Sequence, residues 1–168
     1  MDKNKSKSIQ AGKTKFIVIG FVAVLLIGFV VIKSLSGGGS DVADKTALQD
    51  LKIVKSEITE EAKFYPYKTG NVNMEVLAVK ASDGTVRTAL NTCQVCYDSG
   101  KGYYVQFGDI LECQNCGNRF QLDQIEKIKG GCNPVPIMEE NKTDDGTNIT
   151  IKSDFLVEYK SYFERWKK

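Results

Sequence analysis

The chain has 168 residues, of which 42% are hydrophobic and 26% charged, and its 23 basic side chains nearly balance its 21 acidic ones. This is an ordinary globular composition, and the basic residues of the larger carboxyl-terminal part are dispersed among acidic ones, so we expect no nucleic-acid partner. Because the sequence has no histidine, no Gly-x-Ser-x-Gly motif and no phosphate-binding loop, hydrolytic or nucleophilic catalysis has little support. We therefore expect a carrier or binding protein rather than an enzyme.

The first predicted element is a membrane-spanning helix. Residues 16–32 include no polar side chain, and at about 1.5 Å per residue they cover roughly 26 Å of the ~30 Å hydrocarbon core. Lys15 and Lys33 flank this segment, and their long side chains reach toward the polar headgroups. The lack of a polar face argues against a buried core helix. We therefore predict a transmembrane anchor over residues 16–33.

The charges on either side of the anchor predict its orientation. Five lysines and one acidic residue precede the anchor, whereas acidic residues outnumber basic ones after it. Under the positive-inside rule, residues 1–15 form a cytoplasmic basic tail and the rest of the chain is extracytoplasmic. The predicted location is the cell membrane, in single-pass topology, with the lipid bilayer as a partner. A cleaved signal peptide is the alternative, because Ser34 and Ser36 are small residues just after the apolar run.

Residues 34–60 are predicted to connect the anchor to a folded domain. The glycine-rich residues 37–40 form a flexible exit from the bilayer. Leucine and valine side chains at helical intervals in residues 41–55 predict a short spacer helix. The extracytoplasmic, cysteine-rich, metal-binding domain then comprises residues 61–168.

Two β-hairpins and a terminal helix are predicted in this domain. Strand-prone runs at 73–80 and 85–90 flank an Asp-Gly turn, and a second pair of runs covers 103–107 and 110–112. From Ser153 onward, aromatic side chains fall on one helical face, which we interpret as core packing. The predicted fold class is α+β: a single transmembrane helix, then a small hairpin-rich domain of ribbon-like or Rieske-like type with a C-terminal amphipathic helix.

The cysteines carry the strongest functional signal. Cys93 and Cys96 form one Cys-x-x-Cys pair, and Cys113 and Cys116 form a second pair after an interval of sixteen residues. Each pair falls at the end of a predicted hairpin, so the two pairs together can surround one metal ion with four thiolates. Soft sulfur ligands favour zinc, iron or copper(I) over magnesium or calcium. We predict these four cysteines to be metal ligands.

The fifth cysteine, Cys132, lies in a segment rich in glycine and proline that can fold over the site as a lid. Three roles are open for it: a ligand that replaces one of the other four, a redox partner, or a free buried thiol.

The cysteine segments resemble a known family. The resemblance covers residues 62–137 and includes the residues 91–97, the motif Cys113-Gln-Asn-Cys116-Gly117, Phe120 and the motif Gly130-Gly-Cys132-Asn-Pro134, which are similar to those of the FtrD-like membrane iron–sulfur proteins. It implies an iron–sulfur cluster or thiolate-bound iron at the cysteines, Cys132 included. It also implies an electron-transfer or iron-handling role in an iron uptake system, beside a separate iron permease and exported partner proteins.

Two alternatives stay open beside this interpretation. The spacing of the pairs fits a structural zinc ribbon that presents the domain to a partner. Thiol–disulfide exchange is consistent with an extracytoplasmic location, although no thioredoxin-like βαβ pattern accompanies the pairs. A Rieske cluster with its usual ligands is excluded, because it needs two histidines. Any cluster here is therefore held by thiolates alone.

Overall fold

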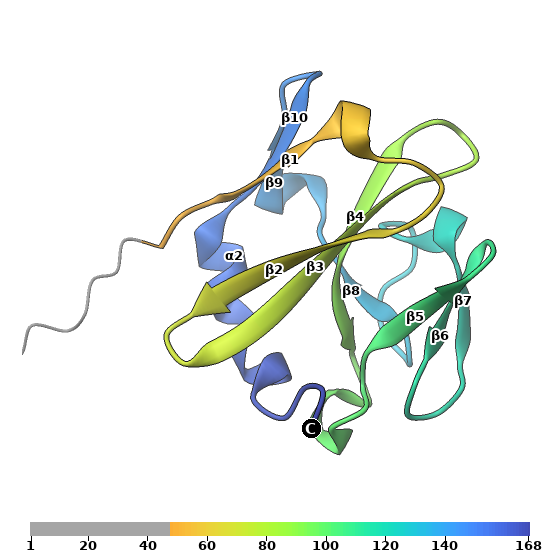
Figure 1. Ribbon diagram of the computed structural model, residues 1–168, viewed down its shortest axis with the longest axis vertical. Coiled ribbons are helices and arrows are strands. Elements are labelled where there is room, and N and C mark those ends of the chain that lie inside the picture. Colours follow the sequence, from red (N-terminus) through yellow and green to blue (C-terminus); the bar gives the residue numbers. More distant parts are fainter. Residues whose placement is uncertain (1–47) are drawn as a thin grey trace, which may run out of the picture. The chain divides into compact units, whose positions relative to one another are not determined.

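The computed structural model describes residues 48–168, which form short antiparallel strands in three sheets and one short α-helix (Figure 1). This part of the chain is mainly β, so the predicted α+β class fits only in part. The predicted tail, residues 1–15, and the predicted anchor, residues 16–33, lie outside the described residues. Between residues 48 and 168, no helix is long and apolar enough to cross a membrane.

The central sheet has four strands in the order β2-β3-β4-β8. Their bounds are β2 Lys63–Thr69, β3 Val72–Lys80, β4 Val86–Cys93 and β8 Pro134–Pro136. Strands β3 and β4 form the first predicted hairpin, in which the Ala81 N–H bonds the carbonyl of Thr85 at 2.9 Å across the turn. The prediction of this hairpin is confirmed, and β4 ends at the first cysteine.

A second sheet has the order β5-β6-β7, with β5 Tyr104–Phe107, β6 Ile110–Cys113 and β7 Arg119–Gln121. Strands β5 and β6 confirm the second predicted hairpin, and β6 ends at the third cysteine. The ribbon-like and Rieske-like descriptions of the domain both stay predictions.

The third sheet has the order β1-β10-β9, with β1 Leu51–Val54, β10 Asn148–Ile151 and β9 Lys142–Asp144. Strand β1 corrects the predicted spacer helix over residues 51–54. The side chain of Ile53 is fully buried and that of Lys52 is exposed, which is the alternation of a strand rather than of a helix. Residues 51–54 form a strand because they pair with β10, which lies far along the chain. Residues 41–47 of the predicted spacer lie outside the described residues.

Two hydrophobic cores lie on opposite faces of the central sheet. On β3, Val76 and Ala78 belong to the first core, while Leu77 and Val79 belong to the second. Successive side chains of a strand point to opposite faces, so an unbroken apolar run is buried on both sides. The first core includes residues of β1, β10 and the C-terminal segment, and the second includes residues of the β5-β6-β7 sheet with Cys93, Cys96 and Cys113.

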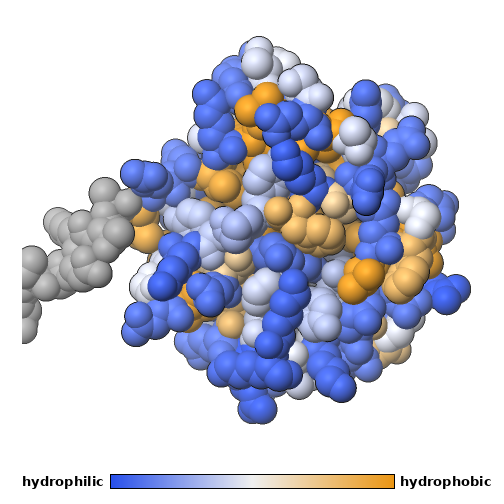
Figure 2. All heavy atoms as spheres, viewed as in Figure 1, coloured by the Kyte–Doolittle hydropathy of each residue, from blue (hydrophilic) through white to orange (hydrophobic). Residues whose placement is uncertain are grey.

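The predicted C-terminal helix is shorter than expected. Helix α2 covers Ser153–Glu158, and Tyr159 leaves the helical conformation before a 3-10 turn at Lys160–Phe163. The interpretation of its aromatic face as core packing is confirmed, because Phe155 and Phe163 are buried in the first core. Hydrophilic side chains cover most of the face seen in Figure 2, with smaller apolar patches between them.

Candidate metal centre

Three segments of the chain meet at Cys93, the last residue of β4. Strand β8 pairs antiparallel with β4 and places Pro134 opposite Cys93, so Cys132 arrives directly beside the first cysteine pair. The register shifts between Leu90 and Cys93, an irregularity of the kind that redirects side chains next to functional sites. The Cys93 N–H also bonds the Gly102 carbonyl at 2.7 Å, just before β5.

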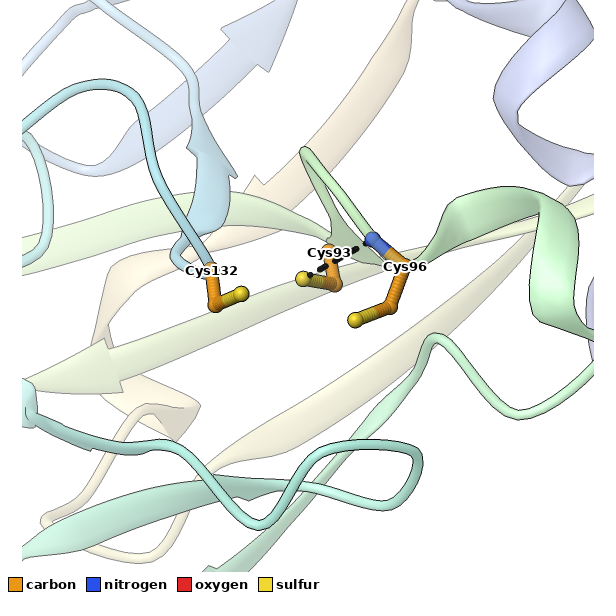
Figure 3. Close-up of side chains that lie close together, drawn as sticks. All are labelled: Cys93, Cys96 and Cys132. Carbon is orange, nitrogen blue, oxygen red and sulfur yellow. Dashed lines mark hydrogen bonds between the residues drawn. The ribbon is translucent and has the colours of Figure 1, made fainter.

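All five cysteines lie close together, and all five are free thiols. Their sulfur atoms form two groups, within each of which every sulfur lies within 4.8 Å of the others. One group is Cys93, Cys96 and Cys132, and the other is Cys96, Cys113 and Cys116. Cys96 therefore belongs to both groups. Figure 3 shows the first group, with Cys132 on its own loop facing the two cysteines at the end of β4.

The loop of the first pair, residues 93–96, is tightly packed. The backbone N–H of Cys96 points at the Cys93 sulfur at 3.3 Å, and the Ser99 hydroxyl donates to the Cys96 carbonyl at 2.7 Å. A Cβ added to Gly102 would lie only 2.3 Å from that carbonyl oxygen. The close approach of these two backbone segments therefore requires glycine at position 102.

The loop of the second pair is a turn that begins at the end of β6. The Gly117 N–H bonds the Cys113 carbonyl at 2.8 Å, and the Cys113 N–H bonds the Asn118 carbonyl at 2.9 Å. Gly117 has a φ of 71°, which glycine adopts without steric cost. The turn holds Cys113 inside the second core, while Cys116 is exposed.

The loop that carries Cys132 is held by three polar side chains. The Tyr104 hydroxyl and the Asn118 amide each donate to the Cys132 carbonyl at 2.7 Å. The Gln94 amide donates to the Pro134 carbonyl at 3.1 Å, and its oxygen accepts from the Gly130 N–H at 3.1 Å. These side chains come from the segments that carry the other four cysteines, so the loop is fastened to both pairs.

The family model described as "Membrane iron-sulfur containing protein FtrD-like" matches residues 58–163. The chain belongs to the FtrD-like family. The matched residues contain all five cysteines and all three side chains that hold the loop of Cys132. No curated protein and no solved structure matches the chain.

The thiols of this FtrD-like protein differ in acidity because their surroundings differ. Burial raises the pKa of Cys113 to about 12, and the neighbouring Cys116 thiol raises the pKa of Cys132 to about 12. Burial also acts on Cys93, but the Tyr104 hydroxyl and the backbone N–H groups of Cys96 and Val95 outweigh it and lower its pKa. The N–H of Asn118 lowers the pKa of Cys116. The surroundings of the cluster therefore shift the pKa values of neighbouring thiols in opposite directions.

Burial divides the cluster into an inner and an outer part. Cys93, Cys96 and Cys113 are buried, whereas Cys132 is partly exposed and Cys116 is exposed. Access from solvent to the cluster therefore runs past Cys116 and Cys132.

The donor set of the FtrD-like centre fits a soft metal. Five sulfur atoms converge from three segments, and thiolates are the ligands that iron–sulfur clusters, iron and zinc use in proteins. The structure brings together all four cysteines predicted as metal ligands and adds Cys132 to the same cluster. Their role as ligands stays a prediction.

The roles of Gln94, Tyr104 and Asn118 in holding the loop of Cys132 were not predicted from the sequence. Tyr104 lies between the two cysteine pairs in the sequence, where an aromatic side chain can either cover the site or pack as an ordinary strand residue. The structure buries it beside Cys93 and bonds its hydroxyl to the loop. Gln94 is next to Cys93 and Asn118 comes two residues after Cys116, and this proximity in sequence is the one signal that pointed to them.

Proposed function

We propose that this protein is a membrane-anchored carrier whose extracytoplasmic domain holds an iron–sulfur cluster or thiolate-bound iron, and that it serves electron transfer or iron handling in an iron uptake system. A separate iron permease and exported proteins are its proposed partners. The cysteines hold the iron, and the side chains around them fix their positions.

The observation that carries this proposal is the convergence of five free thiols on one place in a member of an iron–sulfur family. Three of them are part of the second core, so the centre has rigid support. Rigid support keeps ligand geometry unchanged during electron exchange or between loading and release, and the surrounding hydrogen bonds orient the ligands.

The graded exposure of the cysteines supports exchange with a partner. Cys116 is exposed and Cys132 is partly exposed, and Val95, between the cysteines of the first pair, has a side chain that is 60% exposed. A partner can approach the centre at this edge without opening the core. The buried cysteines keep the inner side of the centre away from water.

A structural zinc site is the second candidate. The turn from Cys113 to Gly117 at the end of a three-stranded sheet is the arrangement found in zinc ribbons. In this case the metal stabilises the fold and the activity of the protein is binding to a partner.

Elemental analysis together with an absorption spectrum decides between these candidates. The full chain is purified in detergent without oxygen, and its iron, zinc and acid-labile sulfide are measured per chain. Iron with sulfide and visible thiolate-to-iron bands is the expected result, and iron without sulfide indicates thiolate-bound iron. Colourless protein with zinc supports the second candidate, and protein that binds neither metal contradicts both.

The proposed topology has a test of its own. Protease added to intact cells is expected to degrade residues 61–168, while a tag placed before residue 16 survives until the cells are permeabilised. A folded domain that is spared until permeabilisation contradicts an extracytoplasmic location.

A further inference from the structure

The last residues of the chain pack against the loop of the first cysteine pair. We infer that the C-terminal segment, residues 159–168, is a positioning element of the metal centre, which it serves by holding residues 91–100 in place. The contacts described below are made by the protein alone. Only the expected effect on metal binding rests on the proposed function.

Three hydrogen bonds connect the two segments. The Trp166 indole N–H donates to the Asn91 carbonyl at 2.8 Å, and the Thr92 hydroxyl donates to the Tyr162 carbonyl at 3.3 Å. The backbone N–H of Lys168 donates to the Gly100 carbonyl at 3.0 Å. These bonds hold the segment both before Cys93 and after Cys96, so both sides of the first pair are fixed.

Side-chain packing adds a contact directly beside Cys96. The ring of Tyr97, the next residue, stacks on Tyr162 with centroids 4.2 Å apart and an interplanar angle of 13°. Stacked aromatic rings attract one another beyond the effect of the apolar area that they bury. Tyr162 in turn meets the edge of Tyr159 at 5.3 Å. The stacked pair fixes the direction in which the chain leaves Cys96.

The C-terminal segment is itself firmly anchored. Phe163 is buried in the first core, on the other face of the central sheet from the cysteines. Asn91, which accepts from Trp166, is also buried, and its side-chain oxygen accepts from the Tyr104 N–H at 2.8 Å. The segment therefore connects the first core to the residues around Cys93, Cys96 and Tyr104 and restricts their movement. Trp166 and Lys168 lie outside the residues 58–163 that match the family model.

Side chains that orient metal ligands from outside typically change metal affinity by about 10–100-fold when they are removed. Tyr162 and Trp166 act on Cys96 and Cys93 through nearby residues, Tyr97 and Asn91. Loss of either contact leaves the four sheet strands in place but frees the loop of the first pair.

The test compares Tyr162→Leu with Tyr159→Leu in the full chain. Both variants exchange a half-buried tyrosine of the same segment for leucine, but only Tyr162 stacks on Tyr97. The chelator-stripped, reduced protein is treated with iodoacetamide, and alkylation is followed by mass spectrometry of tryptic peptides. Cys93 and Cys96 fall in peptide 88–101, while Cys113 and Cys116 fall in peptide 102–119.

We expect Tyr162→Leu to raise the alkylation rate of peptide 88–101 by about tenfold over Tyr159→Leu, because local opening exposes buried thiols. The rate for peptide 102–119 should stay unchanged. Trp166→Phe, which keeps an aromatic ring and removes the N–H, is the second variant and should raise the same rate. Equal rates in peptide 88–101 for Tyr162→Leu, Tyr159→Leu and the unchanged chain overturn the inference.

Competition with a chromophoric chelator for Zn²⁺ gives the metal-dependent readout. Tyr162→Leu is expected to bind Zn²⁺ about tenfold more weakly than Tyr159→Leu. Equal affinities overturn the inference while the proposed function stands. An unchanged chain that binds neither zinc nor iron contradicts the proposed function, and the alkylation rates then decide the inference alone.

Discussion

Gly102 shows at the scale of one residue how closely the first cysteine pair is enclosed. A methyl group in Gly102→Ala would meet the Cys96 carbonyl oxygen at 2.3 Å and the Tyr97 Cα at 2.8 Å. Both are backbone atoms and cannot turn aside, so the loop must move. We expect Gly102→Ala to destabilise the fold by about 1–3 kcal/mol and to weaken metal binding. Thermal unfolding and Zn²⁺ competition measure the two effects, and Lys101→Ala, at an exposed neighbour, is the control.

The five cysteines can be ranked by single substitutions to serine. Cys96 belongs to both sulfur groups, so Cys96→Ser is expected to cause the largest loss of bound metal. Cys113→Ser should remove most of the metal because this thiol is buried inside the second group, whereas Cys132→Ser should lower the metal content without abolishing it. Metal per chain is measured in the purified protein. A Cys113→Ser variant with unchanged metal, beside a Cys132→Ser variant with none, contradicts this ranking.

The cysteines could be predicted as a site from their spacing alone, because Cys-x-x-Cys is a local pattern. The side chains that hold Cys132 could not. Tyr104 reaches the Cys132 carbonyl across 28 residues of sequence, and Asn118 reaches it across 14. Contacts of this kind depend on the pairing of β8 with β4. Local sequence propensity does not predict which strands pair, so these contacts could not be predicted.

The hydrogen bonds that hold the loop of Cys132 in place can be tested by single substitutions. Tyr104→Phe removes one of two donors to the Cys132 carbonyl, and Asn118→Ala removes the other. A single loss should cost about 1 kcal/mol, and the double loss more than the sum, because the carbonyl then has no partner from either side chain. Alkylation of Cys132, in tryptic peptide 130–142, reports the opening of this loop.

The control for this experiment is Tyr103→Phe. Its ring lies near Lys167, with the ammonium 5.1 Å from the ring centroid, and not against the loop. Alkylation of Cys132 that rises equally in Tyr103→Phe and Tyr104→Phe would show that the hydroxyl of Tyr104 does not fasten the loop.

Local pattern predicted some elements correctly and misassigned others. Both hairpins were predictable because each combines β-prone runs with a short turn. Residues 51–54 were assigned to a helix because a short apolar run fits either period, and the partner strand that decides between them lies about a hundred residues later. The C-terminal helix ends early because the chain turns at Tyr159 and its last residues bond to Asn91 and Gly100.

At the scale of the whole described unit, the cysteines belong to one of two cores. Cys93, Cys96 and Cys113 pack with residues of the β5-β6-β7 sheet, while the β1-β10-β9 sheet packs on the other face of the central sheet. A metal bound by the cysteines would therefore join three segments of the chain beside the second core. The first core has no cysteine. The two cores should respond differently to loss of the metal.

We expect metal removal to loosen the second core and leave the first one intact. A chelator should increase amide hydrogen exchange in β5, β6, β7 and the loop of Cys132, because these elements lose the metal that joins them. Exchange in β1, β10 and α2 should change little. Hydrogen-exchange mass spectrometry of the full chain, with and without chelator, measures both. Faster exchange that is uniform over both cores would mean that the two cores open as one cooperative unit, and the metal would then stabilise the whole fold rather than its own half.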